Sequence, residues 1–325
     1  MAGRRTNLVL LVLIALALVS GVVMWAVGSG WGRWPTVVHG GVGVAIVIMA
    51  PWKAMVSRRG LRRRGVPAAV PGLALVFLVT TSLLTGVLHR AGARDAGLAL
   101  VMQFHVGSAL VALPLALWHV ASHPVRPRRT DLTRRSLLRG ALLAGGSTVA
   151  TLALPHAGRA ATRSLERGSF QPAAMPVTQW LFDTVPVVDG EVWSLRVAER
   201  LWSLDELERL ADREVVVTLD CTGGWYARQR WAGVPLDRLL AASGVSEGRS
   251  IEVQSVTGYR RRYPTRDAPV LLLATRVGGR RLSSGHGFPA RLVAPNRRGY
   301  WWVKWVNEIS VDHRPWWWQS PFPLS

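Results

Sequence analysis

The stretch Thr218-Leu219-Asp220-Cys221-Thr222-Gly223-Gly224-Trp225 decides the fold expected for the C-terminal half of the chain. The β-branched run from Glu214 to Leu219 predicts a buried strand, and the cysteine follows this strand directly and enters a glycine turn. A thiolate at a strand end is open to a soft metal or an electrophile, and the glycines leave room for a bulky group. Cys221 is the only cysteine among 325 residues, so an intramolecular disulfide or a cysteine-rich metal cluster cannot form.

Two arginines follow the cysteine closely. Arg228 and Arg230 predict a lowered pKa for the Cys221 thiol, which is the condition for a reactive cysteine. Two other interpretations stay open at this point. The cysteine could be an inert buried residue, or it could be the nucleophile of a hydrolase, which would need a partner base such as His286 or His313.

The sequence around this stretch predicts an α+β domain. A capping box, Ser203 to Glu206, opens a short helix that ends near Ala211. A second helix is predicted from Pro235 to Ala242 and is ended by Gly244. Further strands are expected over residues 251–256, 270–274, 291–294 and 300–311, with a hairpin turn at 278–279.

Five short segments occur in the order known from one family: 219–221, 231–236, 256–259, 286–295 and 299–305. On these segments, residues 170 to 312 resemble the molybdopterin-binding domain of the sulfite oxidase superfamily. The resemblance implies a molybdenum-dependent oxidoreductase that transfers an oxygen atom to or from a small substrate. It also implies that Cys221 binds the molybdenum beside the dithiolene of one pyranopterin, a role that suits a soft thiolate.

Other roles implied by the resemblance concern the pterin. Thr257 would hydrogen-bond it, His286 would contact the cofactor, and Arg291 and Lys304 would hold its terminal phosphate. The backbone at Trp302 and Val303 would line the same pocket.

The segment behind the cysteine bears on the substrate. Relatives that oxidise sulfite carry an arginine pair there, whereas this chain has Gly223-Gly224-Trp225, with Arg228 and Arg230 only later. The interpretation therefore keeps both arginines as candidate catalytic residues beside Cys221 but disfavours sulfite. The run 260–262 is predicted to be a solvated turn or a lip that attracts anions, and Trp316 to Trp318 an interface or a packed tail.

The N-terminal half has the composition of a membrane protein. Apolar residues make up 49% of the chain, and the net charge is +21. Of this charge, +16 lies in residues 1–159, between long apolar runs. A nucleic-acid-binding protein would instead concentrate arginines on a folded polar domain. Composition thus excludes a wholly soluble enzyme, a disordered chain and a disulfide scaffold, and it gives no support to a nucleic-acid partner.

Four apolar runs, about 8–28, 36–56, 68–89 and 98–121, are long enough to cross a bilayer, and a fifth, 138–155, is shorter. Arginine-rich loops follow the second and fourth runs, so the positive-inside rule places the N-terminus in the cytoplasm and the C-terminal half outside the cytoplasmic membrane. Residues 133–139 resemble a twin-arginine export signal, although a plain basic loop is the alternative. The expected domains are 1–125, 126–160 and 161–325.

The four long runs contain a repeat at offsets of 65 to 66 residues. His39 and Trp52 correspond to His105 and Trp118, which predicts two duplicated helical hairpins with both histidines at one depth. An ionisable residue inside a membrane helix is a functional candidate. The pattern resembles small cytochrome b-type membrane domains, and this implies that His39 and His105 bind a haem b. His89 is an alternative ligand, and packing histidines are the alternative interpretation.

The sequence as a whole therefore predicts an all-α transmembrane bundle of four helices and a fifth anchoring helix, followed by an exported α+β domain of the sulfite oxidase molybdopterin-binding fold. Electrons would pass through the haem to or from a quinone or another carrier. Two alternatives remain: a molybdopterin enzyme whose helices are only an anchor, and a binding module that has lost the metal.

Overall fold

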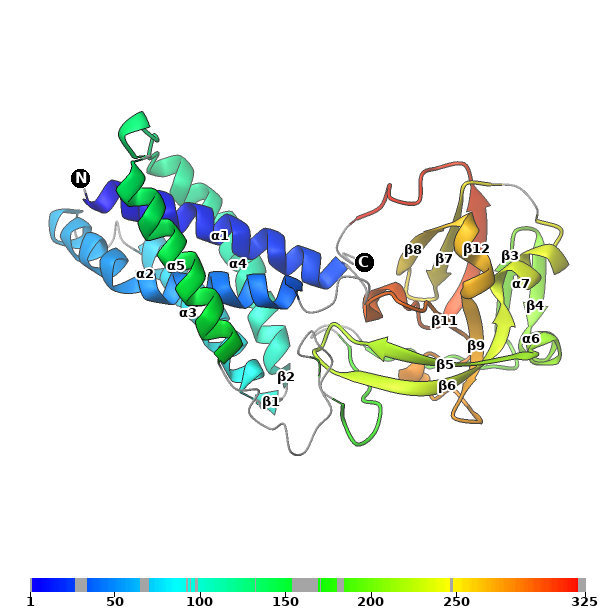
Figure 1. The fold of residues 1–325 in the computed structure, drawn as a ribbon. Helices are drawn as coiled ribbons and strands as arrows, with labels where there is room; N and C mark the ends of the chain where they lie inside the picture. The colour runs from blue at the N-terminus through cyan, green and yellow to red at the C-terminus, as the bar shows by residue number, and fades with distance from the viewer. Residues whose placement is uncertain are drawn as a thin grey trace. The chain divides into compact units, whose positions relative to one another are not determined.

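A computed structural model describes residues 2–26, 34–64, 70–91, 93, 95–96, 99–131, 133–153, 169, 171–179, 184–245 and 248–320. The chain divides into a helical unit that ends at Gly168 and a sheet unit that begins at Ser169 (Figure 1). The domain boundary expected at residue 160 lies outside the described residues. The expected order, apolar helices followed by a sheet-containing domain, is confirmed.

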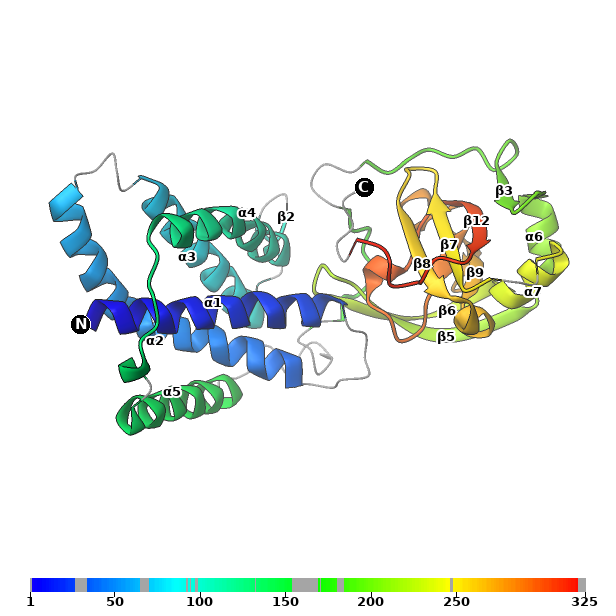
Figure 2. The ribbon, with the colours of Figure 1, turned by 90° about the horizontal axis from the view of Figure 1, so that it is seen from above.

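Among its described residues, the helical unit has five helices that are long and apolar enough to cross a membrane. They are α1 (Ala2–Ala26), α2 (Trp34–Arg64), α3 (Val70–Arg90), α4 (Val101–Ser122) and α5 (Arg134–Ala153). A short pair of strands, β1 (Asp95–Ala96) and β2 (Ala99–Leu100), lies between α3 and α4. Helix α3 packs on α4, and α2 packs on α5 (Figures 1 and 2).

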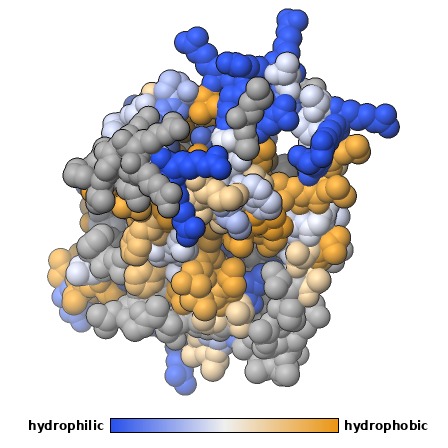
Figure 3. Space-filling model, turned by 90° about the vertical axis from the view of Figure 1, so that its left-hand side faces the viewer, coloured by the Kyte–Doolittle hydropathy of each residue, from blue (hydrophilic) through white to orange (hydrophobic). Residues whose placement is uncertain are grey.

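Large apolar side chains are exposed along these helices, as a bilayer-facing surface requires. Phe77, Leu117 and Leu142 are 70%, 64% and 75% exposed. In Figure 3, apolar side chains lie below a group of hydrophilic side chains that gathers at the top of the view. A water-soluble protein rarely exposes apolar surface on this scale, so the helical unit fits a membrane protein.

Two glycines of α2 lie at its contact with α5, and the closer one, Gly40, leaves no room for a side chain. A Cβ at Gly40 would lie 2.7 Å from Cγ2 of Thr151, and one at Gly41 would lie 3.5 Å from Oγ1 of Thr148. The Arg90 guanidinium also donates to the Thr151 carbonyl at 2.9 Å. Small residues at helix contacts are typical of membrane bundles. Helix α5, which begins at the predicted export signal, is therefore packed as part of the bundle.

The described part of the sheet unit forms two five-stranded sheets. One has the order β10-β9-β6-β5 with β11 beside β9, and the other has the order β4-β3-β12-β7-β8. The strands of the first sheet are β5 (Arg213–Asp220), β6 (Tyr226–Pro235), β9 (Leu272–Val277), β10 (Arg280–Arg281) and β11 (Arg291–Val293). Those of the second are β3 (Ser194–Val197), β4 (Arg200–Ser203), β7 (Ser250–Ser255), β8 (Arg260–Pro264) and β12 (Val306–Asp312).

Two short helices connect these strands. Helix α6 (Leu204–Leu210) begins at the predicted capping box, in which Ser203 and Glu206 satisfy each other's backbone N–H groups. Helix α7 (Leu236–Ala242) follows β6 directly. Side chains such as Trp231 and Ile251, one from each sheet, are fully buried, so both sheets contribute to the core of the unit.

The strand predicted over 300–311 is too long. Residues 299–301 form a 3-10 turn, and β12 begins only at Val306. The backbone changes direction at Trp305, whose φ of +52° is left-handed. The strand expected at 270–274 is observed at 272–277, and the arginine-rich strands β6 and β8 were not predicted.

The run 260–262 is not a solvated turn. It opens β8, and the Arg261 and Arg262 side chains are buried. Arg261 lies over the rings of Tyr300, at 4.9 Å, and Trp301, at 5.8 Å. Arg262 forms ion pairs with carboxylates on β7 and β12. Aromatic rings of the 299–301 turn and carboxylates of β7 and β12 make burial of these two charges possible.

The register of β6 on β9 depends on a glycine at a bulge. A Cβ at Gly233 would lie 2.0 Å from the carbonyl oxygen of Leu273. We predict that Gly233→Ala destabilises the sheet unit by about 3 kcal/mol. Val216→Ala, at an exposed position on neighbouring β5, is the control and should change stability little. Thermal unfolding of the full chain in detergent measures both, and equal midpoints for the two variants would contradict the prediction.

Candidate functional site

The turn after β5 fixes the position of Cys221. The Cys221 N–H donates to the Trp225 carbonyl at 2.8 Å, and the Gly224 N–H donates to the Cys221 carbonyl at 3.1 Å. Gly224 has a φ of +86°, which suits glycine in such a turn. The Gly223 N–H lies 3.4 Å from the Cys221 sulfur. The half-buried thiol is therefore held at a strand end, as the sequence predicts.

A second segment closes against the cysteine from residue 298 onward. A Cβ at Gly299 would lie 3.0 Å from the Cα of Cys221, so this approach needs glycine. Arg298 forms an ion pair with Asp220 and donates to the Cys221 carbonyl at 3.3 Å. Asp220 also accepts from the Ser169 hydroxyl at 2.7 Å. These contacts bring the 298–299 segment and the cysteine turn together.

Arg291 is the buried cation of the site. Its side chain lies among the rings of Trp231, at 5.3 Å, and Trp302, at 5.7 Å, and its Nη1 donates to the His286 carbonyl at 3.2 Å. Within the described parts of the chain, Arg291 has no carboxylate partner and its Nε has no hydrogen-bond acceptor. Burial lowers the pKa of Arg291 to about 10, while the nearby Cys221 thiolate raises it. A buried guanidinium of this kind favours an anion beside it.

Lys304 is brought close to Arg291 by a glycine. Gly287 has a φ of +107°, and a Cβ there would lie 3.1 Å from Cβ of Lys304 and 3.2 Å from Cβ of Arg291. The Lys304 ammonium donates to the Gly285 carbonyl at 2.9 Å and to two oxygens of residues 178–179, each at 3.2 Å. These three acceptors are neutral oxygens.

The environment acts on the thiol in opposite directions. Burial raises the pKa of Cys221, whereas the Gly223 N–H and the charges of Arg298, Lys304 and Arg291 lower it. The net direction is upward. The thiolate form therefore needs further stabilisation, which a bound metal cation provides.

Arg228 and Arg230 do not act on the thiol as the sequence predicted. Arg228 is exposed and lies opposite Thr218 in the β5–β6 ladder, while Arg230 forms an exposed ion pair with Glu214 at 3.3 Å. Both arginines lie on β6, and their partners on β5 are two and four residues before Asp220, further from the cysteine turn. The cations that do act on the thiol, among them the unpredicted Arg298, come from later in the chain.

His286 lies in the short turn before Gly287. Its Nε2 is 3.1 Å from the Met175 carbonyl, and its Nδ1 is 2.7 Å from the Ser283 hydroxyl. Burial lowers the pKa of His286, the Met175 carbonyl raises it, and the neighbouring cations lower it. The net downward direction keeps the ring neutral at pH 7 and makes it a donor or acceptor rather than a third cation.

Thr257, Trp302 and Val303 occupy different surroundings. Thr257 is exposed in the turn after β7, and the N–H of its neighbour Val256 donates to the Trp305 carbonyl at 2.9 Å. Trp302 is buried edge-to-face against Trp231, with ring centroids 5.5 Å apart. The buried Val303 accepts from the Leu292 N–H through its carbonyl at 2.8 Å. The structure thus brings Cys221, Arg291, His286 and Lys304 together, with the tryptophan behind Arg291.

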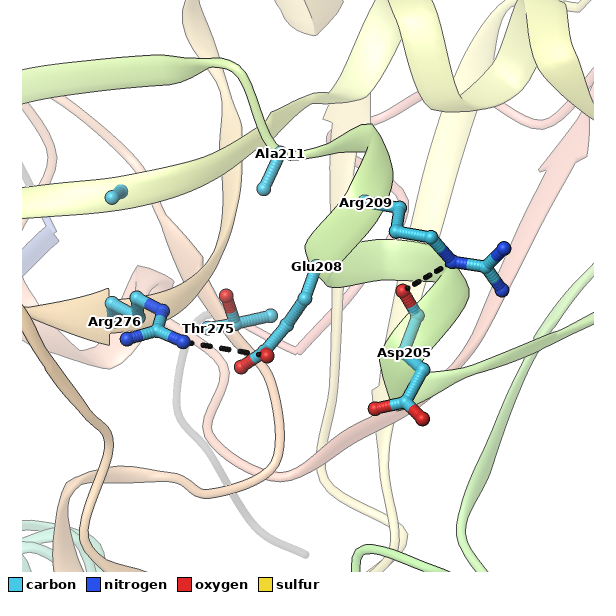
Figure 4. Close-up of a pocket in the computed structure, with 7 residues that line it drawn as sticks. Asp205, Glu208, Arg209, Ala211, Thr275 and Arg276 are labelled. Atoms are coloured by element: carbon cyan, nitrogen blue, oxygen red, sulfur yellow. Dashed lines mark hydrogen bonds and ion pairs between the residues drawn. The ribbon is translucent and has the colours of Figure 1, made fainter.

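A separate hollow of about 460 Å³ lies elsewhere in the sheet unit, beside α6 and β9 (Figure 4). In it, Glu208 pairs with Arg276 at 3.4 Å and with Arg281 at 2.9 Å. Its lining includes neither Cys221 nor the cations around it. We therefore do not assign the candidate site to this hollow.

In the helical unit, His39 of α2 and His105 of α4 lie side by side. Their ring centroids are 5.9 Å apart and their planes are nearly perpendicular, at 88°. Glycines of the preceding helices abut both rings: a Cβ at Gly21 would lie 3.3 Å from Cε1 of His39, and one at Gly86 would lie 3.0 Å from Cε1 of His105. The duplicated sequence therefore places a histidine against a glycine twice.

Other residues of the repeat do not join this pair. The glycines after His39 face α5, and no described atom comes within 4 Å of a Cβ built at Gly107. The ring of His119, in the last turn of α4, stacks on His123, which directly follows the helix, with centroids 4.8 Å apart.

A family profile matches the sheet unit. Residues 182–318 match the sequence profile of the family described as oxidoreductase molybdopterin binding domain. Mitochondrial sulfite oxidase of Rattus norvegicus is 29% identical over 167 residues, which cover 39% of this chain and 30% of that protein. The protein-methionine-sulfoxide reductase catalytic subunit MsrP of Xanthomonas axonopodis pv. citri is 33% identical over 126 residues, 33% of this chain and 39% of that one.

A protein of Azospira oryzae, provisionally named as protein-methionine-sulfoxide reductase subunit YedZ1, is 28% identical over 139 residues, 40% of this chain and 53% of its own. The chain thus spans 30% to 53% of the length of these relatives. The solved structure of the sulfane dehydrogenase SoxCD from Paracoccus pantotrophus is 24% identical, with a TM-score of 0.38 over 40% of each chain. The profile match over residues 182–318 supports the expected molybdopterin-binding domain in the sheet unit.

Because Cys221 is the only cysteine, alkylation reports directly how the neighbouring charges act on the pKa of its thiol. The Arg291 charge lowers the pKa of the Cys221 thiol, so Arg291→Met removes this stabilisation of the thiolate and raises that pKa. We predict that alkylation of metal-free full chain by iodoacetamide then has its midpoint at a higher pH. Arg291→Lys, which keeps the charge, and Arg230→Met, at the exposed ion pair, should stay close to the parent. A midpoint shifted equally by Arg230→Met would show that the assignment is wrong.

Proposed function

We propose, starting from the molybdopterin-binding domain that residues 182–318 form, that this chain is a membrane-bound molybdenum-dependent oxidoreductase. The observation that carries the proposal is the buried, positively charged surroundings of the only thiol. Arg291 and Lys304 flank a cysteine whose thiolate form is disfavoured by burial, and Arg291 Nε has no acceptor in the described chain. A molybdenum cofactor with an anionic phosphate end satisfies both the thiolate and the cations.

The residues of the site fit such a cofactor. Cys221 would bind the metal, because a soft thiolate suits a metal that changes oxidation state. Arg291 and Lys304 would bind the terminal phosphate, the first by its forked guanidinium and the second as a point charge. His286 and Thr257 would hydrogen-bond the pterin. When bound, the cofactor supplies oxygen-atom transfer and the storage of two electrons.

The chain itself positions the Cys221 thiol and shields the Arg291 guanidinium from water. The turn at Gly224 and the close approach of Gly299 hold the thiol in place, and the Trp231–Trp302 pair keeps the Arg291 guanidinium dry. Buried charges interact more strongly than solvated ones.

The charges left for a substrate are few. Once Arg291 and Lys304 serve the cofactor, the remaining described cation near the thiol is Arg298, which is paired with Asp220. Arg228 and Arg230 are exposed on β6. This arrangement favours a small neutral oxide over sulfite, and reduction of a sulfoxide, the activity in the name of the Xanthomonas relative, is one such reaction.

For the helical unit we propose a haem b between His39 and His105. His39 and His105 would bind the haem iron, and their rings lie next to each other, with centroids 5.9 Å apart. Each Nδ1 has a partner on the preceding helix of its hairpin, Ser20 Oγ for His39 and the Ser82 carbonyl for His105. Metal-bound histidines usually have such a second partner.

This haem would carry single electrons between the molybdenum and a quinone or another carrier. The five apolar helices support a multi-pass location in the cytoplasmic membrane, and the arginine-rich loops support an extracytoplasmic sheet unit. The rival proposal, helices that serve only as an anchor, lacks an explanation for two histidines held at one place in apolar helices.

The proposal requires that the thiol retain molybdenum. We expect full chain purified from a host that makes molybdopterin to contain molybdenum, and Cys221→Ser to lose it by at least about tenfold, because the ligand is removed. Elemental analysis measures this, with Arg230→Met as a control that should match the parent. Equal molybdenum in Cys221→Ser and the parent would exclude the thiolate as ligand, and none in the parent would favour the metal-free binding module.

The haem proposal predicts a Soret absorption band in full chain expressed with sufficient haem. His39→Ala and His105→Ala should each abolish or strongly weaken this band, because each removes one of the two imidazoles that would bind the iron. His123→Ala changes a histidine that stacks on His119 just after α4, and it should leave the Soret band intact. A parent without a Soret band would leave the helices as an anchor only.

A further inference from the structure

The two histidines of the helical unit differ in what holds them, although the sequence around them is repeated. His39 Nδ1 lies 3.0 Å from a side-chain atom, the Ser20 hydroxyl oxygen of α1. His105 Nδ1 lies 2.7 Å from a main-chain atom, the Ser82 carbonyl oxygen of α3. One of these acceptors can be removed by a single substitution and the other cannot.

The hydroxyl proton of Ser20 is already used within α1. Ser20 Oγ donates to the Leu16 carbonyl at 2.6 Å, and the Ala17 carbonyl lies at 3.2 Å. A serine hydroxyl has one proton and two lone pairs, so toward His39 it acts as an acceptor. The Ala17 carbonyl is a second acceptor for the His39 ring. The His39 proton therefore sits on Nδ1, and the lone pair of the neutral ring is on Nε2.

His105 reaches the same tautomer by another route. A carbonyl oxygen can only accept, so His105 Nδ1 carries the proton that it donates to Ser82. Thr85, which corresponds to Ser20 in the repeat, donates its hydroxyl proton to the Thr81 carbonyl at 2.6 Å and lies 3.1 Å from the Ser82 carbonyl. The hydroxyl that contacts the ring in the first hairpin is thus bonded to main chain in the second.

We propose that Ser20 is a positioning residue for His39, which fixes its Nε2 tautomer and ring orientation for iron, while the Ser82 main chain does the same for His105. The proposal rests on the haem site proposed above. An acceptor on Nδ1–H makes an imidazole a stronger electron donor to its metal. Stronger donation favours oxidised iron, so the Ser20 hydroxyl lowers the reduction potential of the haem.

The matched test uses three variants of full-length, haem-loaded protein in detergent: Ser20→Ala, Ser20→Thr and Ser82→Ala. Ser20→Ala removes the hydroxyl acceptor but leaves the Ala17 carbonyl, so we expect the Soret band to be retained. We also expect a midpoint potential above that of the parent and a haem affinity up to about tenfold lower. Ser20→Thr keeps a hydroxyl and should restore the parent values. Ser82→Ala removes only a hydroxyl 3.4 Å from His105 Nδ1 and keeps the carbonyl.

Potentiometric titration followed at the Soret band gives the midpoint of each variant. A raised midpoint in Ser20→Ala with parent values in Ser82→Ala supports the role of Ser20, as does loss of haem from Ser20→Ala that Ser20→Thr restores. An unchanged midpoint and haem affinity in Ser20→Ala, or equal shifts in Ser20→Ala and Ser82→Ala, would overturn it. A parent that binds no haem would overturn the haem site itself, which is a different result.

Discussion

The sheet unit places the buried cation Arg291 beside a single thiol. Arg291 is buried among tryptophan rings without a carboxylate partner in the described chain, and the ammonium of Lys304 has only neutral acceptors in the three hydrogen bonds given above. Burying such charge is costly unless an anion accompanies it. Two glycines, Gly287 and Gly299, permit the close backbone approaches that collect these groups around Cys221. An anionic cofactor bound by the thiolate would offset the charge of Arg291 and stabilise the thiolate form of Cys221. The proposed chemistry depends on this pairing of cations and thiolate.

The helical unit also holds polar groups in apolar surroundings, here two histidines. Apolar helices disfavour polar side chains, yet two imidazoles are held next to each other, each against a glycine and each with an acceptor on Nδ1. The duplicated hairpins place the rings, and α5 packs on α2 through Gly40 and Gly41. The glycines next to His39 therefore serve helix packing, whereas the glycines that make room for the histidines lie on α1 and α3.

Much of this was accessible from the sequence, and the exceptions have physical reasons. The β-branched strand before Cys221, the capping box at Ser203 and the apolar helices are local patterns, and the structure contains each of them. The roles of Arg298, Gly299 and Ser20 depend on contacts between distant segments, which no local pattern reports. Arg228 was misjudged because successive residues of β6 lie further and further from the cysteine turn. Arg261 was misjudged because two of its three aromatic partners, Tyr300 and Trp301, lie 39 and 40 residues later.

The most direct measurement of the central claim is molybdenum K-edge X-ray absorption of the purified full chain, compared with the Cys221→Ser protein reloaded with cofactor. The account predicts a sulfur shell around molybdenum that is one sulfur larger in the parent than in the variant. Identical sulfur shells in the two proteins would contradict it, because the thiol of Cys221 would then not be bound to the metal.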